Sequence, residues 1–336
     1  MPLTTPRWWY RRQGGGLKAA LLKPLAAVYA ERASQRLRSQ PGFDPGVPVI
    51  SIGNLTVGGS GKTPVVREIL HMLARNGVDA HGLSRGYGAN QAGPLRVDAD
   101  RHTAIDVGDE PLMLAQDHPF WIARDRVAGA RAAVEAGAGV LVLDDGHQNP
   151  SLKKAVSVVV VDGETRNGDW PFGDGSVVPA GPMREPLAEG LARADAVVVM
   201  LPNDLAVPDP ELLALFGDLP VTIARLGPVR RPPSGSRLGF AGIAKPWRFE
   251  QSLRSAGVEL KGFRSFPDHA AYTEATLANL ASQADRLGAG LITTEKDWVR
   301  LSPEWRPRIE SWPVRARFDD EAVILDRLPR DPTERV

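Results

Sequence analysis

The sequence predicts an α/β fold built on a mainly parallel sheet, and three observations support this prediction. From Val47 onward, apolar β-branched runs alternate with helical stretches, the pattern of chains that wind strand, helix and strand. The first run, Val47–Ile52, leads into a glycine-rich turn and then a helical segment. The almost unbroken valines of Val156–Val161 are typical of a strand that is buried on both faces.

Length and composition are those of a globular protein with about two domains. The chain has 336 residues, of which 43% are hydrophobic and 24% charged, so it can bury a sizeable core. A net charge of +1 gives no reason to expect nucleic acid as a partner. The absence of cysteine excludes disulfides and thiolate metal sites. We expect neither a signal peptide nor a membrane-spanning segment, because no apolar run is long enough.

The first α/β unit is expected to contain five strands, at Val47–Ile52, Ala80–Leu83, Val140–Leu143, Val156–Val161 and Ala196–Met200. Helical patterns lie between them, at Val65–Asn76, Pro111–Gln116 and Asp125–Ala136. Because helices that connect parallel strands cover both faces of the sheet, this unit should be a three-layer sandwich.

A second, smaller α/β unit is expected after the proline-bearing linker Gly227–Pro233. Its strands are predicted at Leu238–Ile243, Glu259–Phe263 and Gly290–Thr293, and its helices at Trp247–Ala256 and Thr273–Leu287. A last strand, Val314–Phe318, could return to the linker. The expected organisation is an N-terminal segment 1–40, a first domain 41–226, a second lobe with linker strands 227–320, and a tail 321–336.

Residues 1 to 40 form a basic and aromatic segment. Eight basic residues against one acid lie between Pro6 and Arg38, and Trp8, Trp9 and Tyr10 precede an apolar stripe at helical spacing, formed by Leu17, Leu21, Leu25, Val28 and Tyr29. Such a helix can lie on anionic lipid or can pack on its own domain. Lys18 within the apolar arc and a kink at Pro24 count against the lipid anchor, so both readings stay open at this point.

The turn after the first strand reads as a phosphate-binding loop. Its residues are Thr56, Val57, Gly58, Gly59, Ser60, Gly61, Lys62 and Thr63. Glycines allow backbone N–H groups to surround phosphate oxygens, the lysine reaches the β- and γ-phosphates, and the threonine hydroxyl can bind Mg²⁺. Thr56 stands where the general pattern has glycine, and a glycine-rich hairpin is the alternative.

Two carboxylates, Asp144 and Asp145, follow the apolar strand Val140–Leu143. This is a Walker-B-like arrangement, in which an acid at the strand tip holds the Mg²⁺ that it shares with Thr63. An Asp-Gly turn is the alternative.

Asp109 in Gly108-Asp109-Glu110-Pro111 has two readings. It can begin a helix, where acids favour the dipole and proline suits the first turn. It can also be the general base that phosphoryl transfer to an alcohol requires. Local sequence favours the helix start.

Other loops give weaker signals. Arg85 just after a strand could clamp a phosphate, and Arg184 lies beside Glu185 in a proline-bounded loop. Asp268 and His269 form a titratable pair in the second unit, and Thr293–Asp297 reads as a helix start. A surface turn or a solvated side chain is the commoner explanation for the loop residues taken one by one.

Three other classes compete with an enzyme that transfers phosphate. A GTPase switch needs an Asn-Lys-x-Asp element, which Glu295-Lys296-Asp297 does not match. A membrane-associated ATPase switch of the partitioning type has a lysine before the glycine pair, where this chain has Val57. A plain membrane-surface module would leave the loop and the acids without a role.

As a set, these motifs resemble the tetraacyldisaccharide 4'-kinase family of the lipid A pathway. The resemblance rests on residues 53–64, 83–88, 108–111, 144–148, 179–186, 240–243, 266–269 and 293–297, which occur in family order. The one departure is Ala244-Lys245-Pro246, where the family leads us to expect a histidine before the proline.

The resemblance implies an ATP- and Mg²⁺-dependent kinase that phosphorylates the 4'-hydroxyl of tetraacyldisaccharide 1-phosphate to give lipid IVA. It implies a P-loop NTPase-like nucleotide-binding domain and a second lobe joined by a two-stranded linker. It also implies a peripheral enzyme on the cytoplasmic face of the inner membrane. We expect it to act as a monomer, with no nucleic acid partner.

The resemblance also assigns roles to residues. Lys62 and Thr63 bind phosphate and metal, with Arg85 and Arg184 beside the nucleotide. Asp109 is implied as the base. Metal-side acids are Asp144, Asp145 and Glu185, and His147 and Gln148 lie nearby. Asp268 and His269 are implied to act from the second lobe, the histidine by steering Asp109 or the substrate.

Overall fold

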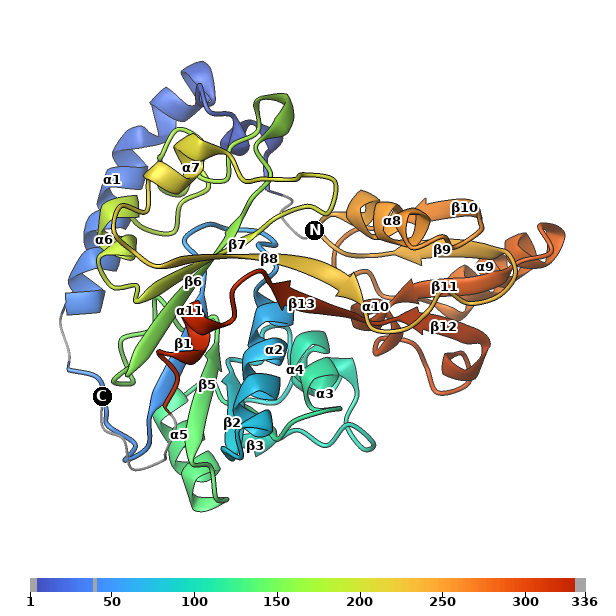
Figure 1. Ribbon diagram of the computed structural model, residues 1–336, viewed down its shortest axis with the longest axis horizontal. Coiled ribbons are helices and arrows are strands. Elements are labelled where there is room, and N and C mark those ends of the chain that lie inside the picture. The colour runs from blue at the N-terminus through green and yellow to red at the C-terminus, as the bar shows by residue number, and fades with distance from the viewer. Residues whose placement is uncertain (1–4, 39–40, 330–336) are drawn as a thin grey trace.

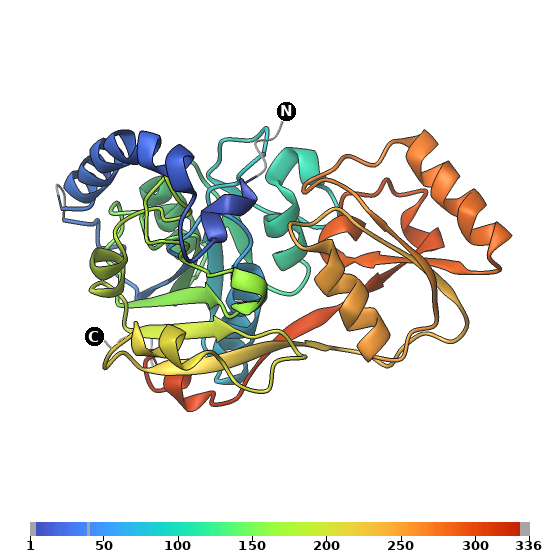
Figure 2. The same cartoon turned by 90° about the horizontal axis from the view of Figure 1, so that it is seen from above.

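The computed structural model describes residues 5–38 and 41–329, and these form two α/β lobes joined by a pair of strands (Figure 1). The larger lobe contains a nine-stranded sheet and the smaller lobe a four-stranded sheet. Figure 2 shows the two lobes side by side, with the smaller one at the end of the joining strands. The predicted α/β class, with a mostly parallel sheet and a second sheet lobe, is confirmed.

The large sheet has the strand order β13-β8-β7-β6-β1-β5-β2-β4-β3. All neighbours are parallel except β3 with β4 and β13 with β8, at the two edges. The strands are β1 (Val49–Gly53), β2 (Ala80–Ser84), β3 (Leu95–Arg96), β4 (Phe120–Ile122), β5 (Val140–Asp144), β6 (Val156–Asp162), β7 (Ala196–Met200), β8 (Val221–Pro228) and β13 (Val314–Phe318). Because β1 pairs with both β5 and β6, the loops after β1 and β5 lie next to each other at the carboxyl edge.

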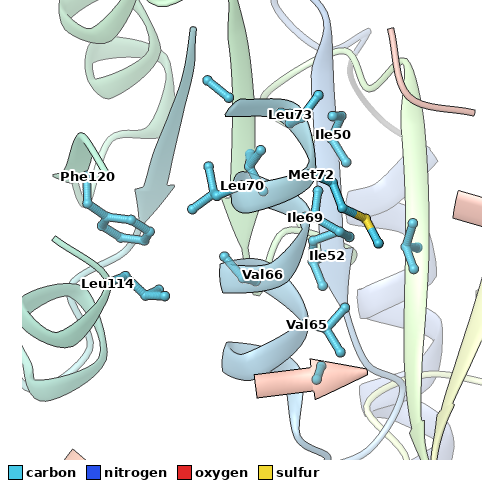
Figure 3. Packing of buried hydrophobic residues seen from close by; sticks show 14 of the residues in the cluster. Ile50, Ile52, Val65, Val66, Ile69, Leu70, Met72, Leu73, Leu114 and Phe120 are labelled. Atoms are coloured by element: carbon cyan, nitrogen blue, oxygen red, sulfur yellow. The ribbon is translucent and has the colours of Figure 1, made fainter. Parts of the chain in front are cut away.

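Helix α2 (Lys62–Arg75) packs on one face of this sheet and fills the main core (Figure 3). Ile50 and Ile52 of β1 meet Val66, Ile69 and Leu70 of the helix, all fully buried. The next residues along the strands, such as Val49 and Leu141, face the opposite layer, where α5 (Arg126–Glu135) packs. This alternation follows from the two-residue period of a strand and produces the predicted three layers.

Short helices complete the large lobe. They are α3 (Ala104–Val107), α4 (Asp109–Leu114), α6 (Leu187–Leu191), α7 (Pro210–Ala214) and α11 (Ala322–Leu325). Two single 3-10 turns, η1 (Arg7–Tyr10) and η2 (Arg166–Gly168), lie in its loops. Most of these elements, and the strands β3 and β4, were not predicted from the sequence, because pieces of two to six residues show no reliable periodicity. The eight-residue strand β8 was not predicted either.

The small lobe contains a parallel sheet of order β10-β9-β11-β12 between two helices. Its elements are β9 (Arg237–Ala241), α8 (Pro246–Ser255), β10 (Leu260–Ser265), α9 (Glu274–Arg286), β11 (Gly290–Thr294), α10 (Glu295–Trp298), η3 (Arg306–Arg308) and β12 (Ile309–Trp312). Helix α8 packs over Ile292 and Trp312, and α9 packs over Leu238 and Leu291 on the other face.

Strands β8 and β13 connect the lobes as an antiparallel pair in which Pro228 is opposite Val314. The prediction that Val314–Phe318 returns to the linker is confirmed by this pairing. The linker itself differs from the prediction, because β8 continues as a strand through Pro228 before the chain enters the small lobe.

The N-terminal helix α1 (Gly16–Arg38) shows two different faces. Its small residues Ala19, Ala26 and Ser34 are buried against the large lobe, and Ser34 Oγ donates to Glu189 Oε2 at 2.6 Å. The predicted apolar stripe points outward, since Leu17 is 77% and Leu21 71% exposed. Pro24 lies inside the helix and does not end it. None of the helices in the described ranges is long and apolar enough to cross a bilayer.

Candidate active site

The phosphate-binding loop lies between β1 and α2, as predicted. Gly58 and Gly61 have φ angles of +105° and +85°, a region that favours glycine, so the loop turns at these two positions before Lys62 begins the helix. Lys62 Nζ lies 3.1 Å from Asn54 Oδ1 and 3.5 Å from Asp145 Oδ1. Ser60 Oγ is buried and has no hydrogen-bond partner among the described residues. A helix N-terminus, a lysine and an unpaired hydroxyl together suit a bound phosphate.

Arg184 holds the loop and the acids together. Its Nε donates to the carbonyl of Thr56 at 3.1 Å, and its Nη1 lies 2.8 Å from Asp145 Oδ1. The backbone N–H of Val57 donates to the carbonyl of Pro182 at 2.8 Å, which fixes the same stretch from a second direction. The loop around residue 184 therefore forms one wall of the site.

Asp144 is the last residue of β5 and Asp145 follows it, and the two carboxylates have different environments. Asp144 is buried, and burial together with the nearby Glu110 carboxylate raises its pKa to about 7. Burial alone would raise the pKa of Asp145 as well, but the Lys62 and Arg184 cations lower it below its ordinary value. Asp145 has a φ of +56°, which places it in a turn directly beside Lys62.

Glu185 lies behind the site. It is fully buried, Gln148 Nε2 donates to its Oε1 at 2.8 Å, and its Oε2 is paired with Arg193. His147 is also buried, within 2.9 Å of both Ser157 Oγ and the carbonyl of Gly190, and burial lowers its pKa to about 3. These side chains support the wall of the site and are occupied by other protein groups.

Asp109 joins the two lobes. It is the first residue of α4, so the helix-start reading holds, yet its Oδ2 is also 2.9 Å from His269 Nδ1 and 2.9 Å from Arg300 Nε. Burial alone would raise the pKa of Asp109, but the hydrogen bond from His269 and the cations Lys296 and Arg300 hold it well below its ordinary value. Asp109 is therefore a stabilised anion.

His269 enters from the loop after β10, with a φ of +57°. A carboxylate can only accept a hydrogen bond from it, so the contact with Asp109 puts the ring hydrogen on Nδ1 and leaves Nε2 as an acceptor. Lys296 Nζ lies 3.5 Å from this Nε2 and 3.1 Å from Glu110 Oε1. Asp268 Oδ1 accepts from the backbone N–H of His269 at 3.1 Å and so stabilises the loop.

The structure thus brings together most of the residues that the sequence selected. Lys62, Asp145 and Arg184 form one contacting group, and Asp109, Asp268 and His269 form a second. Arg85 follows β2 at the same edge of the sheet and is exposed, while Thr63 lies in the first turn of α2.

Sequence reasoning missed Asn54, Lys296 and Arg300 as site residues. Lys296 lies in the segment 293–297, which supports the family resemblance but was interpreted locally as a helix start, and Arg300 lies just beyond it. Lys296 and Arg300 can be recognised as site residues only in the folded structure, because their contacts to Glu110 and Asp109 span more than 180 residues of sequence. Asn54 could have been found from its place directly before the loop.

The fold and this arrangement of a phosphate loop, strand-end acids and a histidine–carboxylate pair define a P-loop phosphotransferase. A family model described as tetraacyldisaccharide-1-P 4'-kinase matches residues 18–330. The chain therefore belongs to the tetraacyldisaccharide 4'-kinase family, and it is a kinase of lipid A biosynthesis. Family membership sets aside the GTPase, the partitioning ATPase and the plain membrane-surface module.

Relatives and a solved structure agree with this assignment. The chain is 60% identical over 326 residues to the tetraacyldisaccharide 4'-kinase of Caulobacter vibrioides strain NA1000, covering 96% of this chain and 97% of the relative. It is also 60% identical to that of Phenylobacterium zucineum, with coverage of 96% and 98%. The crystal structure of LpxK from Aquifex aeolicus in complex with ATP is 24% identical, with a TM-score of 0.72 and coverage of 92% and 99%, and shows the same fold.

Proposed function

We propose that this kinase transfers the γ-phosphate of ATP to the 4'-hydroxyl of tetraacyldisaccharide 1-phosphate, giving lipid IVA. The observation that carries the proposal is the contact between Asp109 of the large lobe and His269 of the small lobe, at the same carboxyl edge of the sheet that bears the phosphate loop. An acceptor alcohol bound between the lobes would meet a proton acceptor on one side and the nucleotide on the other.

The phosphate loop, residues 56–63, is proposed to hold the triphosphate. Lys62 supplies a cation to the β- and γ-phosphates, and Ser60 supplies its unpaired hydroxyl. Arg184 and Arg85 add positive charge at the edge of this site, where charge develops on the transferred phosphoryl group. Lys62 is already paired with Asp145, so the nucleotide would replace part of that ion pair.

Mg²⁺ fits the oxygen groups beside the loop. Thr63 offers a hydroxyl and Asp144 and Asp145 offer carboxylates, and the described residues contain no cluster of three acids or histidines that would form a cage. In kinases, Mg²⁺ is usually bound by a few protein oxygens together with oxygens of the substrate phosphates. When bound, the ion neutralises phosphate charge.

Glu185 is better suited to support than to metal binding. Both of its oxygens are engaged, by Gln148 and by Arg193, and its side chain is fully buried. We therefore propose that it orients Gln148 and the residue 184 loop, in place of the metal-side role that the resemblance implied.

His269 is proposed as the proton acceptor and Asp109 as the residue that orients it. The pKa of Asp109 is held low, so its carboxylate takes up a proton poorly, and its Oδ2 is occupied by Arg300 and His269. His269 is about half exposed, and its Nε2 has a long 3.5 Å contact with Lys296 Nζ that an acceptor hydroxyl would replace. In this scheme Nε2 takes the proton of the 4'-hydroxyl as its oxygen attacks the γ-phosphorus. The bond from the γ-phosphorus to the β–γ bridging oxygen breaks, ADP leaves, and the Asp109 carboxylate stabilises the imidazolium.

The outward stripe of α1 is proposed to lie on the cytoplasmic face of the inner membrane. Leu17, Leu21 and Leu25 are exposed, while the opposite face of the helix packs on the protein. Exposed leucines in a row suit the apolar edge of a bilayer, and the basic residues of the segment suit anionic headgroups. We also propose that the protein acts as a monomer, because its two lobes already bring Asp109 and His269 into contact within one chain.

The test is an assay with γ-labelled ATP and tetraacyldisaccharide 1-phosphate in mixed micelles. We expect label to appear on the lipid, and only with the acceptor present. Release of label as inorganic phosphate, with none on the lipid, would overturn the proposal.

A further inference from the structure

The 3-10 turn η1, which precedes the lipid-facing helix, is docked next to the nucleotide site. The backbone N–H of Trp170 donates to the carbonyl of Tyr10 at 2.6 Å, and Arg11 forms a β-bridge with Asp169. Figure 2 shows this segment over the large lobe, near the start of α1. These backbone contacts hold the turn independently of the apolar stripe on α1.

The side chain of Tyr10 reaches the phosphate-binding loop. Its hydroxyl donates to the carbonyl of Val57 at 2.5 Å. It also lies against Gly58, where a Cβ atom would be only 2.7 Å from the tyrosine oxygen. Burial raises the pKa of Tyr10, so the hydroxyl keeps its proton and remains a donor at neutral pH.

The hydrogen bond from Tyr10 is the third of three that hold the first half of the phosphate-binding loop. The Val57 N–H is bonded to Pro182, the Thr56 carbonyl to Arg184, and the Val57 carbonyl to Tyr10. The two peptide groups on either side of Val57 are therefore fixed in orientation before a ligand arrives. A loop that is already ordered loses less conformational freedom when it binds phosphate.

We propose that Tyr10 is a positioning residue for the phosphate-binding loop. It acts through the Val57 carbonyl, and its hydroxyl keeps the loop in the conformation that receives the phosphates of ATP. The role rests on the proposed nucleotide site and adds to it a residue from outside the P-loop motif.

This role of Tyr10 can be separated from the proposed membrane contact of α1, because three glycines lie between Tyr10 and the rest of the helix. Gly14, Gly15 and Gly16 connect the two, and Gly14 and Gly16 have φ angles of +79° and +60°. The turn is held by its own backbone contacts to Trp170 and Asp169, while α1 is held by its buried small residues, so changes on the exposed face of α1 need not move Tyr10 from Val57. Deletion of residues 1–40 would remove both functions at once and could not distinguish them.

The test compares Tyr10→Phe with Tyr29→Phe in the full chain. Tyr29 lies on the exposed stripe of α1, so its substitution makes the same chemical change away from the loop. We expect Tyr10→Phe to raise the Kd of Mg·ATP, measured by calorimetry without lipid, by roughly three- to tenfold, the effect of one lost hydrogen bond. The KM for ATP should rise similarly, with the KM for the lipid acceptor and binding to anionic vesicles unchanged.

Three outcomes would overturn the assignment. Equal Mg·ATP affinity in Tyr10→Phe and Tyr29→Phe would show that the hydroxyl does not position the loop. A parallel loss of vesicle binding in Tyr10→Phe would show that it only holds the N-terminal segment in place. Failure of the unchanged protein to bind Mg·ATP would instead reject the proposed nucleotide site, and the role of Tyr10 with it.

Discussion

Arg300 Nε donates to Asp109 Oδ2 at 2.9 Å, and both side chains are more than 90% buried. The same arginine bonds Asp297 and the carbonyl of Gly242, so it is fixed within the small lobe. Asp109 therefore presents a constrained carboxylate to His269. A buried ion pair of this kind costs free energy to desolvate, and in the proposed mechanism it serves to orient the histidine.

The first prediction concerns His269 and Asp109. His269→Gln should lower kcat by about 10² to 10⁴, the usual contribution of a general base, with little change in the KM for ATP. Asp109→Asn should also lower kcat, since the amide cannot stabilise the imidazolium. If His269→Gln keeps most of the activity and Asp109→Asn does not, Asp109 is the base instead. Steady-state kinetics with ATP and lipid varied separately decides between them.

Lys62 gives the second prediction. Lys62→Ala should reduce kcat/KM by roughly 10² or more, because the loop loses the cation that faces the phosphates. Lys261→Ala is the matched control, since Lys261 is an exposed lysine of the small lobe that pairs with Glu259. Near-normal activity of Lys62→Ala would remove the loop from the mechanism.

The third prediction concerns the exposed apolar stripe of α1. The triple change of Leu17, Leu21 and Leu25 to Ser should release the protein from anionic vesicles, while the melting temperature changes little, because these side chains contact solvent in the folded protein. Leu287→Ser, at an exposed leucine of the small lobe, is the control and should bind vesicles normally. Unchanged vesicle sedimentation of the triple variant contradicts the anchor.

A pair of histidines on the other side of α2 predicts acid sensitivity. His118 Nε2 lies 3.0 Å from His71 Nδ1, and Arg67, Asp117 and Arg315 surround them. Burial, then the neighbouring His118, lowers the pKa of His71 from 6.5 to about 4. Between these values the unfolded chain binds a proton that the folded protein does not, so stability is lost as pH falls below about 6.5.

The expected loss from His71 is about 1 kcal/mol between about pH 7.5 and pH 5, because the group is partly exposed and solvent screens part of the effect. Urea unfolding at these pH values measures it. His71→Gln removes the titrating group, so its stability should depend less on pH over the same interval. The same pH dependence in both proteins would assign the acid sensitivity to other groups.

Sequence patterns predicted the elements that have a clear period or a strong local motif. The valine run of β6 and the apolar spacing of α2 have this property, as do the glycines of the phosphate loop. The roles of Asp109 and Arg300 could not be assigned in this way, since they depend on the approach of two lobes. Asp109 begins α4, as the helix-start reading predicted, and it also contacts a histidine of the other lobe, which local sequence could not show; its reading as the general base stays a prediction.

The apolar stripe on α1 shows a similar limit of prediction from sequence patterns. Its period predicted a helix correctly, but period alone could not say which face packs on the protein. The small residues Ala19 and Ala26, which the apolar pattern does not single out, turned out to make the intramolecular contact. Close packing depends on the shape of the partner surface, and that shape is set by distant strands and α6.

Because β8 pairs with β13, the small lobe is an insertion between two neighbouring strands of the nine-stranded sheet. Its entry and exit points, Pro228 and Val314, are opposite each other in the same ladder. A short turn could join these two residues and leave the nine-stranded sheet intact, while removing His269, Lys296 and Arg300 together. Within the described residues, the lobe that carries Lys62 and the lobe that carries His269 are thus linked by a stem of two antiparallel strands, β8 and β13.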